Sequence, residues 1–180
     1  LTMSFESVLP VLSQGLGAGA SSTSFSLLMI SVGAGAIISV MALATSSEDL
    51  KRGPILFFTA IGSGLSVIAL AIAPNMPLAM ISAMAVGGTQ AAFMTITLTL
   101  IQTVVPDGIR GRVTSLYLWH IGGVMALANL VNGSIVDEVG AGWVLTISGA
   151  AFVMLTLMSL MRPKWRELYR GGSPVTSIGI

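Results

Sequence analysis

The chain has 180 residues, of which 54% are hydrophobic and only 8% are charged. A soluble domain usually carries about 25% charged residues, so lipid is the natural solvent for a chain of this composition. The net charge of +1 points to no polyanionic partner such as a nucleic acid. The chain has no cysteine, which excludes disulfides and thiolate metal sites, and its single histidine excludes a multi-histidine metal site within the chain.

The first twelve residues form an apolar run of about half the length that a membrane span needs. The chain starts with Leu1 rather than Met, and its start lacks the basic region of a signal peptide. We therefore interpret residues 1–12 as the end of a span that is cut at its start, and the chain as a piece of a longer protein.

Five further segments are long and apolar enough to cross a membrane. A spanning helix needs about 20 mostly apolar residues, and in lipid its backbone must satisfy its own hydrogen bonds. Five segments meet this length and contain no Asp, Glu, Lys or Arg: 25–45, 55–73, 78–105, 113–136 and 143–161. With residues 1–12 they predict an all-α membrane protein, a six-transmembrane-helix bundle whose first helix is truncated.

The charged residues occupy alternate connections between these segments. All eight Lys and Arg residues follow 25–45, 78–105 or 143–161, whereas the opposite connections carry only Asp137 and Glu138. Because Lys and Arg accumulate in cytoplasmic loops, we predict that the basic connections and the tail 163–180 are cytoplasmic. The expected location is the cytoplasmic (inner) membrane of a bacterium.

Small residues recur at four-residue spacing on several of the predicted helices. This pattern allows helices to pack closely in a membrane, and its alternative reading is a bending or sliding role during conformational change. The residues are Ser31, Gly35 and Ser39, then Gly62 with Ser66, and Gly122 with Ala126.

The segment 78–105 carries the clearest polar stripe. Thr95, Thr99, Gln102 and Thr103 share one helical face, and Gln90 lies upstream and somewhat off it. Either the Thr hydroxyls bond to carbonyls of their own helix, or the face lines an aqueous cavity. The sequence leaves both readings open.

Glu6 is the one carboxylate inside an apolar run. An acid within a membrane segment is by default a functional candidate, here for a coupling proton or a cationic solute. The alternative is a solvated position near the outer mouth of the protein.

The segment 113–136 carries several further polar candidates. His120 lies about two turns into it, beside Tyr117 and Trp119, at the interfacial depth where aromatic residues anchor helices. A proton relay at His120 is the alternative. Asn129 and Asn132 lie deeper, where an amide bonds a neighbouring helix or, at Asn129, contacts a substrate.

The connection between 78–105 and 113–136 is a short charged stretch. Pro106 and Gly108 are expected to break the helix, and Arg110 and Arg112 to anchor the loop in the cytoplasm. A second hypothesis is that Asp107, Arg110 and Arg112 make charge contacts that stabilise one conformation. No hydrolase or metalloprotease motif is present, so we do not expect an enzyme.

The same stretch carries a family resemblance. The motifs Val105-Pro106-Asp107, Arg110-Gly111-Arg112-Val113 and Ser115-Leu116-Tyr117 resemble the region around spans ten to twelve of major facilitator superfamily (MFS) transporters. The resembling branch contains the enterobactin exporter and drug-efflux-like permeases. "LPVLSQGLGAGASS" resembles the end of span seven, and "GGTQAAFMTITLTLIQ" resembles span ten.

This resemblance covers the chain to about Met161 and implies a C-terminal half-domain over residues 1–162. It implies two inverted three-helix repeats, a missing N-terminal six-helix half as partner, and a small-molecule substrate bound between the halves near the membrane midplane. The first and fourth helices, which hold Glu6 and the polar stripe, would line the cavity. Transport would be proton-coupled efflux by alternating access, with no cofactor beyond a proton gradient.

The resemblance also implies a cytoplasmic gate. Its members would be Asp107, Arg110 and Arg112 with the loop residues Glu48, Asp49, Lys51 and Arg52, although "ALATSSEDLKRG" departs from the Gly-x-x-x-Asp-Arg-x-Gly-Arg pattern of the family. The alternative function is a non-transporting membrane scaffold or assembly subunit, which needs neither a polar stripe nor an intramembrane acid.

Overall fold

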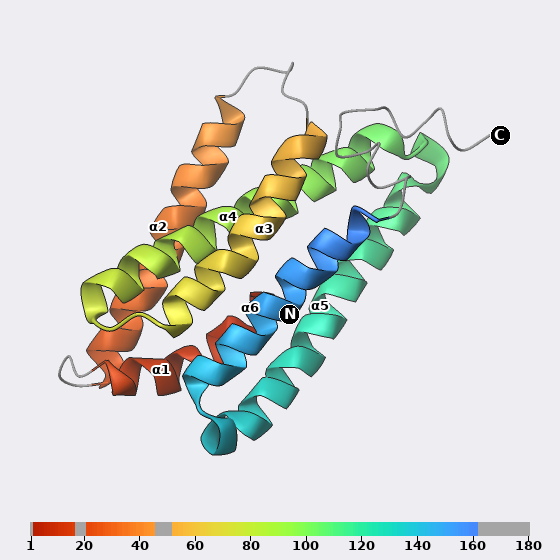
Figure 1. Ribbon diagram of the computed structural model, residues 1–180. Coiled ribbons are helices and arrows are strands. Elements are labelled where there is room, and N and C mark those ends of the chain that lie inside the picture. The colour runs from red at the N-terminus through yellow and green to blue at the C-terminus, as the bar shows by residue number, and fades with distance from the viewer. Residues whose placement is uncertain (1, 17–20, 46–51, 162–180) are drawn as a thin grey trace.

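The computed structural model describes residues 2–16, 21–45 and 52–161, and this part of the chain is helical throughout, with no strand (Figure 1). The chain starts with a short 3-10 helix, η1 (Thr2–Ser7). Six α-helices follow: α1 (Leu9–Gly15), α2 (Ser21–Ala44), α3 (Arg52–Ala71), α4 (Met76–Val104), α5 (Asp107–Val139) and α6 (Ala141–Ser159).

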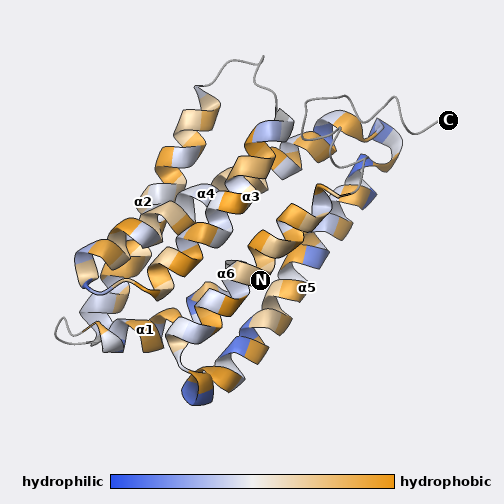
Figure 2. Ribbon diagram, in the orientation of Figure 1, coloured by the Kyte–Doolittle hydropathy of each residue, from blue (hydrophilic) through white to orange (hydrophobic). Residues whose placement is uncertain are grey.

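Five of the described helices, α2 to α6, are long and apolar enough to cross a membrane. Figure 2 shows apolar residues along their whole length, with hydrophilic positions most frequent on α5. The predicted segments and the observed helices agree in number and order. Four of the helices begin two to four residues before the predicted segment, and α5 begins six residues before it because the charged residues belong to the helix.

The first segment differs from the single helical end expected over residues 1–12. The 3-10 helix stops at Ser7, Val8 forms a turn, and α1 runs on to Gly15. Pro10 explains the break, because it lacks an N–H group and is tolerated only within the first turn of a helix. A new helix therefore starts just before it.

The charged connection after α4 is shorter than expected. Pro106 ends α4, with Val105 extended at a ψ of 129°. The Pro106 carbonyl oxygen then accepts hydrogen bonds from the N–H groups of Ile109 and Arg110, so α5 begins at once. The expectation that Gly108 breaks the helix was wrong: Gly108, Arg110 and Arg112 all lie in the first turns of α5.

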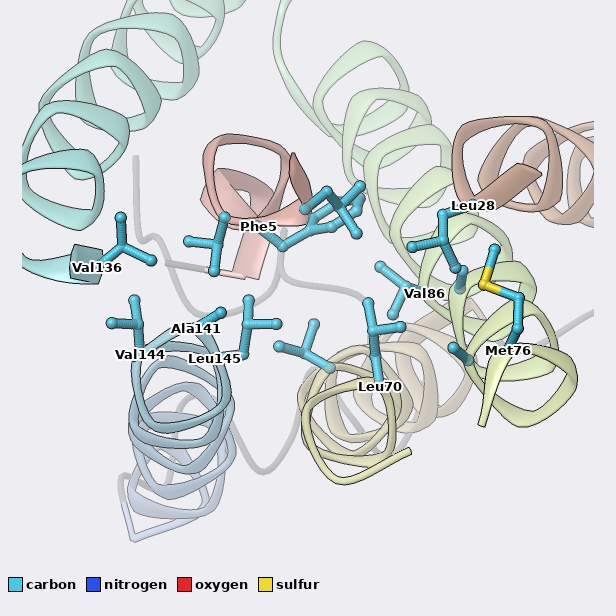
Figure 3. Close-up of a cluster of buried hydrophobic side chains, with 14 residues drawn as sticks. Phe5, Leu28, Leu70, Met76, Val86, Val136, Ala141, Val144 and Leu145 are labelled. Carbon is cyan, nitrogen blue, oxygen red and sulfur yellow. The ribbon is translucent and has the colours of Figure 1, made fainter. Parts of the chain in front are cut away.

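The hydrophobic core lies toward the end of the bundle where α5 turns into α6 (Figure 3). Phe5 of η1 meets Val136 of α5 and Leu145 of α6 there, and each of these side chains is at most 5% exposed. The same cluster continues through the end of α3 and the start of α4. Arg110 and Arg112 lie at the opposite end of the bundle (Figure 1).

The helices α2 and α4 cross in close contact through glycine. A methyl group on Gly35 would overlap the backbone carbonyl of Met84, and one on Gly87 would overlap that of Val32. This confirms the predicted close packing on the Gly35 face of α2. Gly122 has no neighbour within 4 Å in the described part of the chain, so close packing at Gly122 and Ala126 stays a prediction.

Candidate functional site

A cavity of about 280 Å³ lies between four helices, α3 to α6. Its polar lining is Ser63, Gln90, Thr97, Tyr117 and His120. Its apolar lining is Phe93, Ile121, Val124, Met125 and Phe152. The lining contains no Asp, Glu, Lys or Arg.

Helical spacing brings these side chains together. Gln90, Phe93 and Thr97 on α4 are separated by three and four residues, so they share one face. Tyr117, His120 and Val124 repeat the same spacing on α5. The cavity is therefore formed by two helix faces that oppose each other.

Phe152 of α6 and Phe93 of α4 form an aromatic wall. Their ring centroids are 6.2 Å apart and the ring planes are inclined at 81°, an edge-to-face arrangement. Aromatic pairs favour this geometry because the positive ring edge meets the negative ring face. The pair joins α6 to the cavity side of α4.

Tyr117 places a buried hydroxyl group at the cavity with no hydrogen-bond partner among the described residues. Thr97 is its polar neighbour, but the Thr97 hydroxyl donates to the carbonyl oxygen of Phe93 at 2.7 Å. A buried polar group without a partner costs about 1–3 kcal/mol. The Tyr117 hydroxyl thus lies at the cavity with Thr97 as the polar side chain beside it.

Gln90 is the sequence-predicted residue that the structure places in the cavity. Its side chain is 9% exposed, on the α4 face that meets α5. Thr97 was not predicted as a cavity residue, because the stripe of Thr95 and Thr99 on a neighbouring face of α4 is the more polar one. The i, i+3, i+7 spacing from Gln90 to Thr97 was the signal that would have found it.

The predicted polar stripe lies outside the cavity lining. The Thr99 hydroxyl donates to the Thr95 carbonyl oxygen at 2.8 Å, and the Thr103 hydroxyl donates to that of Thr99 at 3.0 Å. Gln102 is exposed. These threonine hydroxyls bond to their own helix, and a role for Thr95, Thr99 and Gln102 in solute contact stays a prediction.

His120 lies deeper along its helix than expected. Because α5 begins at Asp107, His120 is 13 residues into a helix of 33 residues rather than two turns into a shorter span. At 1.5 Å per residue this is about 20 Å along a helix of about 50 Å. The first turns of α5 carry Asp107, Arg110 and Arg112, and a helix of this length exceeds the hydrocarbon core of about 30 Å, so the interfacial depth of Tyr117 and His120 stays a prediction.

Two asparagines follow the cavity on α5. Asn132 donates from Nδ2 to the hydroxyl oxygen of Ser4 at 2.9 Å, which confirms the predicted bond to a neighbouring helix. Asn129 lies one turn closer to the cavity, and its Oδ1 atom is buried without a hydrogen-bond partner in the described part of the chain. The predicted substrate contact at Asn129 stays open.

The remaining candidates lie away from the cavity. Glu6 is exposed on η1. Glu48, Asp49 and Lys51 lie outside the described residues, and Arg52 begins α3. The proposed gate network therefore stays a prediction.

Arg110 makes local contacts across the α4–α5 turn. Its Nη2 atom lies 2.6 Å from Asp107 Oδ1, and its Nε and Nη2 atoms donate to the Val105 carbonyl oxygen at 3.3 and 3.2 Å. The guanidinium therefore satisfies a carbonyl at the C-terminal end of α4. Arg112 is exposed.

The profile of an MFS family described as transmembrane secretion effector matches residues 2–169. The chain belongs to this family. The family and the five long apolar helices of the described residues support a membrane transporter of the MFS type. No match to it was found among curated proteins or among solved structures.

Proposed function

We propose that this protein is a secondary active permease that exports small molecules by proton-coupled alternating access. The observation that carries the proposal is the cavity, in which the buried Gln90 and the Tyr117 hydroxyl lie beside an exposed His120 in an otherwise apolar lining. Polar groups in a membrane interior are costly, so they mark the pathways of solutes. A scaffold subunit would not need them.

The depth of the cavity supports a solute site. Gln90 lies 14 residues after Met76, about 21 Å along a helix of about 44 Å. His120 lies at a similar fraction of α5. Gln90 falls near the middle of its helix, and secondary transporters bind their substrates near the bilayer midplane.

The packing supports two inverted three-helix repeats, one from η1 to α3 and one from α4 to α6. In this arrangement η1 corresponds to α4, α2 to α5 and α3 to α6. The contact of α2 with α4 then corresponds to the contact of α5 with η1, and the contact of α3 with α6 corresponds to itself. All three contacts occur in the bundle. Such repeats allow one part of a transporter to rock against another.

The uneven packing supports alternating access. The core cluster packs the helices tightly at the end of the bundle that holds the α5–α6 turn. Much of α5, by contrast, has exposed apolar side chains, among them Leu116, Leu127 and Leu130. A second six-helix half of the transporter would cover this surface. The basic end would be cytoplasmic in a bacterial inner membrane, and Glu6 and His120 are the titratable groups for proton coupling.

Transport by the native protein in everted membrane vesicles tests the proposal. Solute addition under an imposed proton gradient should release protons, which a pH-sensitive dye reports. Gln90→Leu should lower the initial rate about tenfold or more, because it removes a buried amide from the cavity. Proton release that is absent for every solute tried, or unchanged in Gln90→Leu, would contradict the proposal. Gln102→Leu in the same assay shows whether the polar stripe outside the cavity also contributes to transport.

A further inference from the structure

We propose that the cavity selects an uncharged aromatic molecule of about two fused rings that carries one hydrogen-bonding group. This inference rests on the proposed function, since it names the class of solute that the site takes. It is carried by the volume of the cavity, its four aromatic rings, its lack of charge and the unpartnered hydroxyl of Tyr117.

The volume sets the size of the solute. An apolar cavity of about 150 Å³ holds a single benzene ring. The cavity here is about 280 Å³, which accommodates two fused rings with a small substituent. The Phe93–Phe152 pair bounds the cavity on the α6 side.

The lining favours an aromatic solute over an aliphatic one. Phe93, Tyr117, His120 and Phe152 present four rings from three helices, and Met125 adds a thioether. Ring edges and faces at several angles allow edge-to-face contacts, and sulfur packs favourably against ring edges. A flat bicyclic molecule would use both kinds of contact.

The charge balance excludes ionic solutes. The lining has no carboxylate to pair with a cation and no Lys or Arg to pair with an anion. An unpaired buried charge is far more costly than a buried neutral group. Glu6 is on η1 and is not part of the lining.

The polar group of the solute is placed by Tyr117. The Tyr117 hydroxyl can donate and accept, and Gln90 lines the cavity from the opposing helix. Thr97 uses its proton on Phe93 and has a lone pair left to accept with. A hydroxyl group on the solute matches this set, because it both donates and accepts.

Four probes with one ring system test the proposal on the purified full-length chain in lipid nanodiscs. The probes are 2-naphthol, naphthalene, the cation 2-naphthylmethylammonium and the anion 2-naphthoate. Binding is measured by equilibrium dialysis, with empty nanodiscs subtracted. Saturable binding of one 2-naphthol per chain is expected, at least about tenfold tighter than that of either ion. Equal or tighter binding of an ion, or no saturable binding of 2-naphthol, would overturn the proposal.

Variants locate the binding. Tyr117→Phe and Gln90→Leu should each weaken 2-naphthol binding about fivefold, the value of one neutral hydrogen bond, and leave naphthalene unchanged. Gln14→Leu, at an exposed position of α1, is the matched control. Tyr117→Phe should stay close to the wild-type melting temperature, since Thr97 is the one described side chain that its hydroxyl contacts and no hydrogen bond of ordinary geometry is lost. Wild-type binding of 2-naphthol by both cavity variants would place the probe elsewhere and refute the assignment.

The binding assay and the vesicle assay test the ligand class and the transporter assignment independently. If 2-naphthol binds as expected but no solute moves protons, the transporter assignment falls and the ligand class stands. If solutes are transported and the cation binds as well as 2-naphthol, the ligand class is wrong and the transporter assignment stands.

Discussion

Gly64 of α3 and Gly149 of α6 face each other where the two helices cross. A methyl group on Gly64 would lie 2.9 Å from the carbonyl oxygen of Gly149, and one on Gly149 would lie 2.7 Å from that of Gly64. The contact is reciprocal, so neither helix can carry a side chain here without moving the other. Lipid supplies little hydrophobic drive for association, so such close backbone contact is what holds two membrane helices together.

Replacing Gly149 by Ala should destabilise the bundle by about 1–3 kcal/mol, the usual cost of overpacking. The added methyl group would also meet Ile68, whose nearest side-chain atom is 2.8 Å away. Unfolding in mixed detergent micelles, followed by circular dichroism, measures the loss.

Gly123→Ala is the control for this substitution. Gly123 is also within a helix, but nothing lies within 4 Å of a methyl group there in the described part of the chain. It should keep or slightly gain stability, because Ala is the better helix former. An equal loss in both variants would mean that glycine flexibility, rather than contact, explains Gly149.

The two asparagines of α5 should respond in opposite ways to substitution by leucine. Asn132→Leu breaks the hydrogen bonds to Ser4 and should cost about 1 kcal/mol, within the range measured between membrane helices. Asn129→Leu removes an amide oxygen that has no described partner, so stability should stay level or rise. Chemical unfolding of both variants in the same detergent measures the difference. A larger loss at Asn129 would show that its oxygen is bonded after all.

The orientation in the membrane is testable because the chain lacks cysteine. A single cysteine at Gly108, in the first turn of α5, should react with an impermeant maleimide in everted vesicles only. One at Glu138, near the other end of α5, should react in intact spheroplasts only. Labelling from the reverse sides would invert the predicted topology.

Arg110 should matter for the α4–α5 turn more than Arg112 does. Arg110→Gln loses the forked donation to Val105 and the pair with Asp107, and should cost up to about 1 kcal/mol because the pair is exposed. Arg112→Gln should be neutral to stability, since Arg112 is exposed. Hydrogen exchange at the turn, compared between the variants, should rise for Arg110→Gln alone.

The gate hypothesis makes a separate prediction for Arg112. If its charge stabilises one conformation of the transporter, Arg112→Gln should change cysteine accessibility on both faces without changing stability. Unchanged labelling on both faces would remove Arg112 from the gate and leave it as a topological anchor.

The amino-acid sequence by itself determined the solvent, the helices and their order. Runs of about 20 apolar residues have one stable form in lipid, because a backbone without water must bond within its own helix. Pro106 likewise predicted where α4 ends, since it lacks an N–H group. The start of α5 at Asp107 was not predicted, because a glycine at position 108 is typical of a helix break. The hydrogen bonds to the Pro106 carbonyl oxygen that begin α5 are visible only in the structure.

Only the tertiary structure decided which helix faces meet. The long helices are apolar on all sides, so no amphipathic stripe fixes how each one is rotated in the bundle. By sequence alone, the Thr95–Thr99 face and the Gln90–Thr97 face of α4 are equally good candidates for a cavity wall. The close contacts at Gly35 and Gly149 fix how the helices are rotated, and this places the second face at the cavity. Tyr117 and Gln90 line the same cavity from different helices, and this arrangement depends on packing rather than on spacing along the chain.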